Sequence, residues 1–323
     1  MFQRLLPCSF VIALLVGCNA NSGGISENTW GDAKSPKVIC TFAPIQCFAI
    51  NVVGDHGTVK GILSTQGPHH ADPPANQARL LSQADVFFSN GLKVDDSVVR
   101  KMTDAMGKTG VKATKLGGSI PPSLLLEGTC SCCKDEEGSD HGDHKEIDGH
   151  VWLGIDQAKV MVETMATTLD TREGKTANYS NAAKVYIDKL DKLQADGKAM
   201  LKDKKERTIL PFHGSLRYFA KSFDLELIDP IQDVPGQEPT AKQLDAIVAK
   251  CLKNKVRVIA VEPQYGASNS AKTVLNELKR RGMTDAELVV IDPLETATDG
   301  EMNADWYVTK MRANLEALAK VLK

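Results

Sequence analysis

Three of the seven histidines lie near the carboxyl ends of predicted β-strands. His69 follows the second predicted strand, His150 comes after the fourth strand and a long loop, and His213 follows the first strand of the second half of the chain. Open α/β sheets bind their ligands outside the carboxyl ends of the strands. Neutral imidazole is also a common ligand of transition metals. The placement of the three histidines therefore indicates a metal site.

A carboxylate occupies the same kind of position at the end of the last predicted strand, where Asp292 closes the segment VVIDPL. Three imidazoles and one carboxylate suit a four-coordinate Zn²⁺ site, whereas Mn²⁺ sites usually hold more oxygen ligands. A single histidine is more often exposed or hydrogen-bonded than a ligand, and an isolated Asp-Pro is more often a turn or a helix cap. Because all four residues fall near the ends of predicted strands, a shared metal site is favoured over four unrelated roles.

Residues 117–149 form the one long irregular segment, which contains CSCCKDEEGSDHGDHKEID. A tract so acidic and so poor in apolar residues cannot bury a core. It is either a solvated loop or an accessory loop that collects metal. The candidate accessory ligands are Cys130, Cys132, Cys133, His141 and His144. The three thiols are soft metal ligands, but they could instead form disulfides, whose connectivity the sequence does not determine.

The elements that position these residues alternate between strand and helix from residue 36 onward. The segments that read as strands are KVICTF, TVKGILS, ADVFFSNG and VKATKL in the first half, and RTILPF, LELIDPI, VRVIAVEP and ELVVIDPL in the second half, with helical segments between them. This alternation predicts parallel sheets. We expect an α/β protein of two similar lobes, each a mostly parallel sheet flanked by helices.

Residues 177–203 contain no proline and carry Ala183, Tyr186, Leu190 and Leu193 at helical spacing. Such a stripe is typical of an amphipathic helix. Its place between two α/β lobes predicts one long helix that joins them. A helix of about 25 residues would be roughly 37 Å long.

The N-terminus predicts export. Arg4 precedes a mostly apolar run from Leu5 to Val16, which is about the length of a signal-peptide core. The sequence LVGC, ending at Cys18, resembles the lipobox of bacterial lipoproteins, in which that cysteine is lipidated. The alternative is an ordinary signal peptide with an incidental cysteine. We expect an exported protein that is anchored by lipid at Cys18, in the periplasm or on the cell surface.

These observations divide the chain into five segments. They are a signal peptide over 1–17, a flexible tether over 18–35, an N-terminal lobe over 36–170 with the acidic Cys/His loop at 127–149, a connecting helix over 171–206 and a C-terminal lobe over 207–323. The formal net charge of -2 gives no sign of nucleic-acid binding. We expect a monomer.

Six segments, in order, resemble the solute-binding component of bacterial ABC importers for zinc or manganese, the cluster A-I metal-binding lipoproteins, which include adhesin-like members. The segments are GPHHADPP, GHVWLG, FHGSLRYFAKSF, GQEPTAKQL, VEPQ and DPL. The resemblance covers roughly residues 36–323.

The resemblance implies that His69, His150 and His213 are metal ligands and that Asp292 is the fourth. The third position is usually His in the zinc binders and Glu in the manganese binders, so His213 indicates zinc, with manganese as the alternative. The partner implied is a membrane permease of an ABC importer, and the protein is implied to be no enzyme. The three cysteines of the loop depart from the family pattern, and His70 beside His69 leaves the first ligand ambiguous.

The same residues also fit other functions, which the sequence supports less well than metal transport. The histidines could line a cleft for a chelated metal or an anion. A zinc hydrolase would need an open coordination position, and the sequence has neither an HExxH helix nor a GxSxG elbow. An adhesin could use the same fold as an added role.

Overall fold

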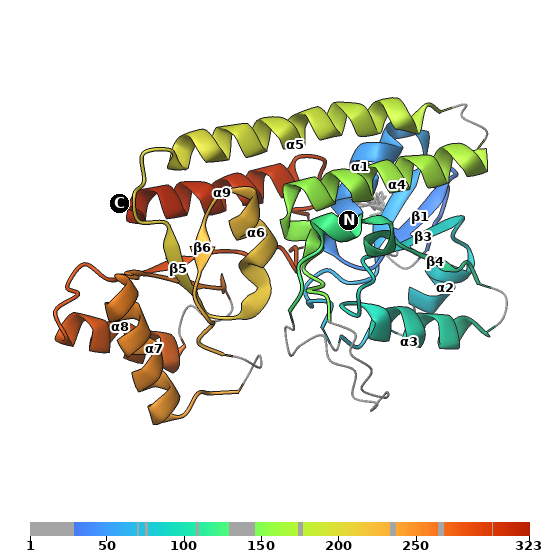
Figure 1. Ribbon diagram of the computed structural model, residues 1–323. Coiled ribbons are helices and arrows are strands. Elements are labelled where there is room, and N and C mark those ends of the chain that lie inside the picture. Colours follow the sequence, from blue (N-terminus) through green and yellow to red (C-terminus); the bar gives the residue numbers. More distant parts are fainter. Residues whose placement is uncertain are drawn as a thin grey trace, which may run out of the picture.

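The computed structural model of the protein describes residues 29–69, 71–74, 77–107, 110–128, 146–173, 177–232, 237–263, 268–298 and 300–323. These residues form two α/β lobes, each with a four-stranded sheet, and long helices run along both lobes (Figure 1). The fold class predicted from the alternation of strands and helices is confirmed.

The first lobe has a parallel sheet in the order β2-β1-β3-β4. Its strands are β1 (Lys37–Cys40), β2 (Thr58–Gly61), β3 (Val86–Ser89) and β4 (Ala113–Lys115), and its connecting helices are α1 (Ala43–Val53), α2 (Gln77–Ser82) and α3 (Asp96–Met106). In the central strand β1, Val38 pairs with Val59 on one side and with Val86 on the other. Successive residues of a strand point to opposite faces, so burial of Val38, Ile39 and Cys40 in a row means that both faces are covered.

The second lobe repeats this plan with a parallel sheet in the order β6-β5-β7-β8. Its strands are β5 (Thr208–Pro211), β6 (Glu226–Leu227), β7 (Val258–Val261) and β8 (Glu287–Val290), and its helices are α6 (Arg217–Ser222), α7 (Ala241–Asn254), α8 (Asn269–Arg280) and α9 (Trp306–Val321). In each lobe the strand order reverses beside the first strand, between β1 and β3 and between β5 and β7. Ligands of such sheets bind at this switch point, beyond the carboxyl ends of the strands.

Helix α4 (Ile155–Glu173) is the main element that the sequence analysis does not predict. It follows the His150 segment after a short 3-10 turn, Val151–Leu153. Ala158, Val162, Met165 and Leu169 are fully buried along one side of this helix. Their spacing is a helical signal that was available in the sequence.

Helix α5 (Tyr179–Leu201) is the long joining helix that the sequence predicts. Its 23 residues span about 35 Å, and it runs along the tops of both lobes as drawn in Figure 1. The predicted apolar stripe is buried against α1, α4 and α9. Among the described residues, no helix is both long and apolar enough to span a membrane.

The C-terminal part of the chain returns from the second lobe to the first. Asn51 of α1 donates to the carbonyl oxygen of Ala304 at 2.7 Å, and the Tyr307 hydroxyl donates to the carbonyl oxygen of Trp152 at 2.6 Å. The rings of Phe48 and Tyr307 also meet edge to face. One apolar core therefore extends through both lobes, and α5 and α9 together tie the lobes to each other.

The close approach of α5 to the second lobe depends on Gly197. A Cβ atom there would lie 2.6 Å from Phe223 and 2.8 Å from Leu315. In an open helix, Gly to Ala would stabilise by about 1 kcal/mol. Here we expect Gly197→Ala to lower the free energy of unfolding by roughly 1–3 kcal/mol, because overpacking outweighs the gain in helix propensity. Urea denaturation of the metal-free protein measures this change.

Lys184→Ala, on the exposed side of the same helix, is the control and should change stability by less than about 0.5 kcal/mol. A Gly197→Ala variant as stable as the wild type would contradict the packing described for α5.

Candidate metal centre

Four side chains from both lobes lie beyond the carboxyl ends of the strands. His69 lies beyond β2, and His150 directly precedes the 3-10 turn that leads to α4. His213 lies two residues beyond the end of β5, and Glu295 lies beyond the end of β8. These are the edges at which α/β sheets bind ligands.

Three of these side chains form a group of potential ligands. His69, His150 and Glu295 each offer one atom, and the three atoms lie within 4.8 Å of one another. Nε2 of His69 lies 3.5 Å from Oε1 of Glu295, and the ring centroids of His69 and His150 are 5.1 Å apart. The ring of His213 lies 5.6 Å from that of His150, just outside this group. The structure thus brings the three predicted histidines together and adds Glu295.

Buried carboxylates orient two of the histidine rings. Nδ1 of His150 is 2.8 Å from Oδ1 of Asp148, and Nδ1 of His213 is 2.9 Å from Oε1 of Glu262. Both pairs are nearly inaccessible to solvent. Each carboxylate accepts a hydrogen bond from Nδ1–H, which leaves the Nε2 lone pair of each ring for a metal ion. Glu262 follows β7 directly, so the switch point of the second sheet supplies both members of the His213 pair.

The backbone around His150 is fixed by a second set of buried groups. The Asn90 side chain donates to the carbonyl oxygen of Gly149 at 3.0 Å. Asn90 and Gly91 in turn donate their backbone N–H groups to the Asp95 carboxylate at 2.7 and 2.9 Å. Because Asn90 follows β3, the switch point of the first sheet holds the segment that presents His150.

The charges of the group suit a cation. Burial lowers the pKa of His150, with the neighbouring His69 and His213 adding to the effect and Asp148 opposing it. Burial acts to raise the pKa of Glu295, but the contact with His69 and the positive potential of the three histidines outweigh it, so the net shift is downward. At neutral pH the site therefore offers a neutral His150 and an ionised Glu295.

Several buried polar atoms of the site lack hydrogen-bond partners among the described residues. They are Nδ1 and Nε2 of His69 and Oε1 of Glu295. An unsatisfied buried polar group costs about 1–3 kcal/mol. A bound cation would satisfy these atoms, and three imidazoles with one carboxylate match the ligands that Zn²⁺ prefers.

The predicted fourth ligand, Asp292, lies outside the group within 4.8 Å. Its Oδ1 accepts the N–H of Leu294 at 2.8 Å, and its Oδ2 lies 3.6 Å from Nζ of Lys310. This carboxylate is therefore engaged in its own turn and with a cation. The structure instead brings Glu295, three residues further along the same segment, next to His69. The sequence signal for Glu295 was a second acidic residue in the segment DPLE, three positions after Asp292.

The remaining predicted site residues lie outside the described residues. They are Cys18, His70, Cys130, Cys132, Cys133, His141 and His144. The base of the acidic loop is described, with Gly128 donating to Glu146 and Asp148 to Leu126 as an antiparallel pair. The Tyr218 hydroxyl of the second lobe donates to the carbonyl oxygen of Asp148 and accepts the N–H of Leu126. The loop thus joins the fold two residues before His150.

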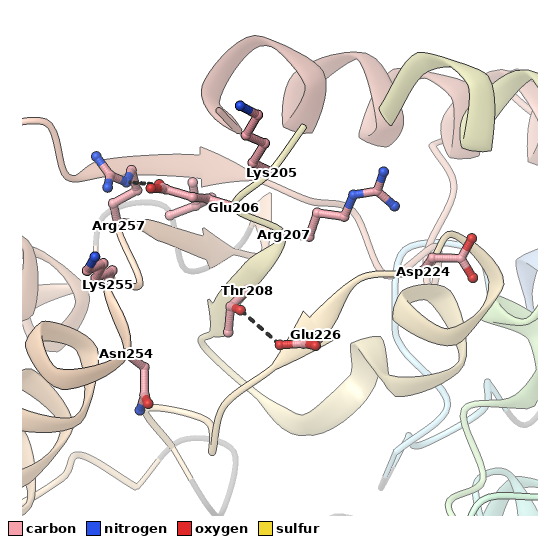
Figure 2. A pocket seen from close by; sticks show the side chains of 10 residues that line it. Lys205, Glu206, Arg207, Thr208, Asp224, Glu226, Asn254, Lys255 and Arg257 are labelled. Carbon is pink, nitrogen blue, oxygen red and sulfur yellow. Dashed lines mark hydrogen bonds and ion pairs between the residues drawn. The ribbon is translucent and has the colours of Figure 1, made fainter. Parts of the chain in front are cut away.

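A separate pocket of 300 Å³ lies at the opposite edge of the second sheet, where β5, β6 and β7 begin (Figure 2). Its lining is strongly charged. Arg257 pairs with Glu206, the Thr208 hydroxyl donates to Glu226, and Arg207 donates to backbone carbonyl oxygens. The lining contains neither histidine nor cysteine, so it is not a candidate for the metal centre.

Comparison with known proteins agrees with the resemblance inferred from the six segments. The family described as zinc-uptake complex component A periplasmic (ZnuA) matches residues 38–321. The zinc-binding lipoprotein AdcA of Streptococcus pneumoniae is 30% identical over 325 residues, which cover 97% of this chain and 60% of AdcA. The chain thus spans about 60% of the length of this curated relative.

Solved structures share the fold. The Zn(II)-bound ZnuA-like domain of AdcA from Streptococcus pneumoniae is 25% identical, with a TM-score of 0.66 over 88% of this chain and 98% of that one. The solute-binding protein FpvC of Pseudomonas aeruginosa in complex with Mn²⁺ is 23% identical, with a TM-score of 0.74 over 90% of this chain and 99% of that one.

The description of this family, a component of a zinc-uptake complex, is that of a transport protein, as the resemblance implied. The match over nearly all of the predicted mature chain shows that this protein belongs to the ZnuA family.

Proposed function

We propose that the protein captures Zn²⁺ between its two lobes and delivers it to the membrane permease of an ABC importer. The observation that carries this proposal is the group of His69, His150 and Glu295. In this group the unsatisfied Nε2 of His69 and Oε1 of Glu295 lie 3.5 Å apart, and the ring of His213 lies beside that of His150. The names of the relatives, a zinc-binding lipoprotein and a Zn(II)-bound domain, support the same cargo.

Each lobe supplies part of the proposed ligand set. His69 and His150 come from the first lobe, and His213 and Glu295 follow strands of the second. His150 and His213 would bind through Nε2, because Nδ1 of each ring faces a carboxylate. Glu295 supplies the negative charge. His213 lies beside the other three, with its ring centroid 5.6 Å from that of His150.

The ligand set favours zinc over manganese. Three imidazole nitrogens and one carboxylate oxygen suit a tetrahedral Zn²⁺ ion, whereas Mn²⁺ prefers oxygen-rich octahedral sites. Competitive titration of the metal-free protein with both ions tests this preference. Tighter binding of manganese would contradict the assignment of zinc as the cargo.

The cellular setting is part of the proposal. Residues 1–17 would direct export, lipid on Cys18 would anchor the protein at the periplasmic or cell surface, and residues 18–35 would tether the two lobes. We further propose that the protein acts as a monomer, and that His141, His144 and the three loop cysteines collect zinc as an accessory to the main site.

Replacing His150 tests the proposed site most simply. We expect His150→Ala to weaken zinc binding by at least about tenfold, or roughly 1.4 kcal/mol, because a fully buried ligand is removed. Titration against a competing chelator measures the affinity. His56→Ala is the control, because His56 is exposed and lies in the 3-10 turn Gly54–His56 that follows α1, away from the site; it should leave the affinity unchanged. An unaltered affinity in His150→Ala would remove His150 from the site.

Proton competition provides a second test. Zinc binds neutral imidazole, so protonation opposes binding. The lowered pKa of His150 keeps that ring neutral down to below the ordinary value of about 6.5, and the lowered pKa of Glu295 keeps its carboxylate ionised over the same range. We expect zinc affinity to vary little above about pH 7 and to fall progressively below about pH 6.5. Titrations between about pH 5 and 8 that show no loss at the acid end would contradict histidine ligation.

A further inference from the structure

We propose that Asp292 is a positioning residue, which builds the turn that holds Glu295 at the metal centre and does not itself bind the metal. This inference rests on the proposed function, because it assigns a role relative to the zinc site. It concerns the segment from Asp292 to Glu295, between β8 and α9, and the helix residue Asn314.

The Asp292 carboxylate closes the turn internally. Its Oδ1 accepts the N–H of Leu294 at 2.8 Å, which is the bond to the backbone two residues ahead that aspartate makes in turns. Leu294 has a φ of 59°, in the left-handed region that side chains other than Gly, Asn and Asp seldom adopt. Its side chain is fully buried. The Asp292 bond and this burial hold Leu294 in that conformation, and Glu295 follows directly.

Asn314 fixes the start of the turn to α9. Its Oδ1 accepts the N–H of Asp292 at 2.9 Å, and its Nδ2 donates to the carbonyl oxygen of Asp292 at 2.7 Å. Asn314 is 4% exposed. A buried amide that loses its partners is costly, so these two bonds set the place of the turn along the helix.

Further bonds connect the turn to the elements that carry the histidines. Nε1 of Trp152 donates to the carbonyl oxygen of Pro293 at 2.8 Å, and Trp152 lies two residues beyond His150. The N–H of Ala297 donates to the carbonyl oxygen of Ser64 at 2.8 Å, in the segment between β2 and His69. Glu295 is therefore bracketed by bonds to both histidine-bearing segments of the first lobe.

The second oxygen of Asp292 faces a cation. Oδ2 lies 3.6 Å from Nζ of Lys310, which also lies 3.0 Å from Glu301. By contrast, Oε1 of Glu295 faces His69 and has no hydrogen-bond partner among the described residues. The two carboxylates thus have different tasks: Asp292 shapes the backbone and Glu295 is left available to the ion.

Two substitutions at Asp292 separate a turn-building role from a ligand role. Asp292→Asn keeps an oxygen that can accept the Leu294 N–H but removes the charge, whereas Asp292→Ala removes both. We expect Asp292→Asn to bind zinc within about twofold of the wild type, and Asp292→Ala to lose about tenfold or more, as for other residues that orient a metal ligand. Competition titration with zinc on the full mature chain measures both.

A double-mutant cycle tests whether the effect passes through Glu295. Glu295→Gln should itself weaken binding, and Asp292→Ala added to it should cause less than about a twofold further loss, because the positioned carboxylate is already gone. Asn314→Leu should behave like Asp292→Ala, and it serves as the second variant if Asp292→Ala does not fold, as judged by thermal unfolding of the metal-free protein.

Three results would overturn the inference. Asp292→Asn as weak as Asp292→Ala would show that the charge of Asp292 acts on the metal directly. Unchanged affinity in Asp292→Ala, or in Asn314→Leu, would show that the turn is not needed. Fully additive losses in the cycle would show that Glu295 is not the route. A wild-type protein that binds no zinc would instead contradict the proposed function, so the two failures are distinguishable.

Discussion

The site depends on the hydrogen bonds that His150 donates to Asp148 and that His213 donates to Glu262. Each joins a buried carboxylate to Nδ1 of a buried imidazole, so that Nε2 is the nitrogen left for a ligand. Glu262 directly follows β7, and Asp148 lies in the paired base of the acidic loop, two residues before His150. These bonds fix the orientation of each ring and therefore the position of its Nε2 atom.

The arrangement of the long helices limits how the lobes can move. Helix α5 runs along both lobes, and α9 carries Tyr307 and its bond to Trp152 back to the first lobe. One continuous apolar core accompanies them. Wide hinge opening would break this core and expose apolar surface, which is unfavourable. We infer that zinc capture proceeds through small shifts at the carboxyl edges, such as an approach of His213 to the other ligands.

The sequence predicted the repeated α/β plan, the long joining helix and the approach of three histidines, because strand periodicity and strand ends are local signals. It did not predict that Glu295 would lie next to His69. Whether Asp292 or Glu295 reaches the histidines depends on the left-handed Leu294 and on Asn314, 22 residues away. The pairing of His213 with Glu262, 49 residues away, was likewise beyond local patterns. Long-range contacts decided these details, and spacing along the chain does not encode them.

X-ray absorption at the zinc edge of the mature protein, loaded with no more than one zinc ion per chain so that the main site fills first, tests the central claim most directly, because it reports the atoms bound to the ion. We expect three imidazole nitrogens at about 2.0–2.1 Å and one carboxylate oxygen at about 2.0–2.2 Å, with no sulfur. Sulfur at about 2.3 Å would place the ion on the cysteines of the acidic loop. That result would contradict the assignment of the site to His69, His150, His213 and Glu295.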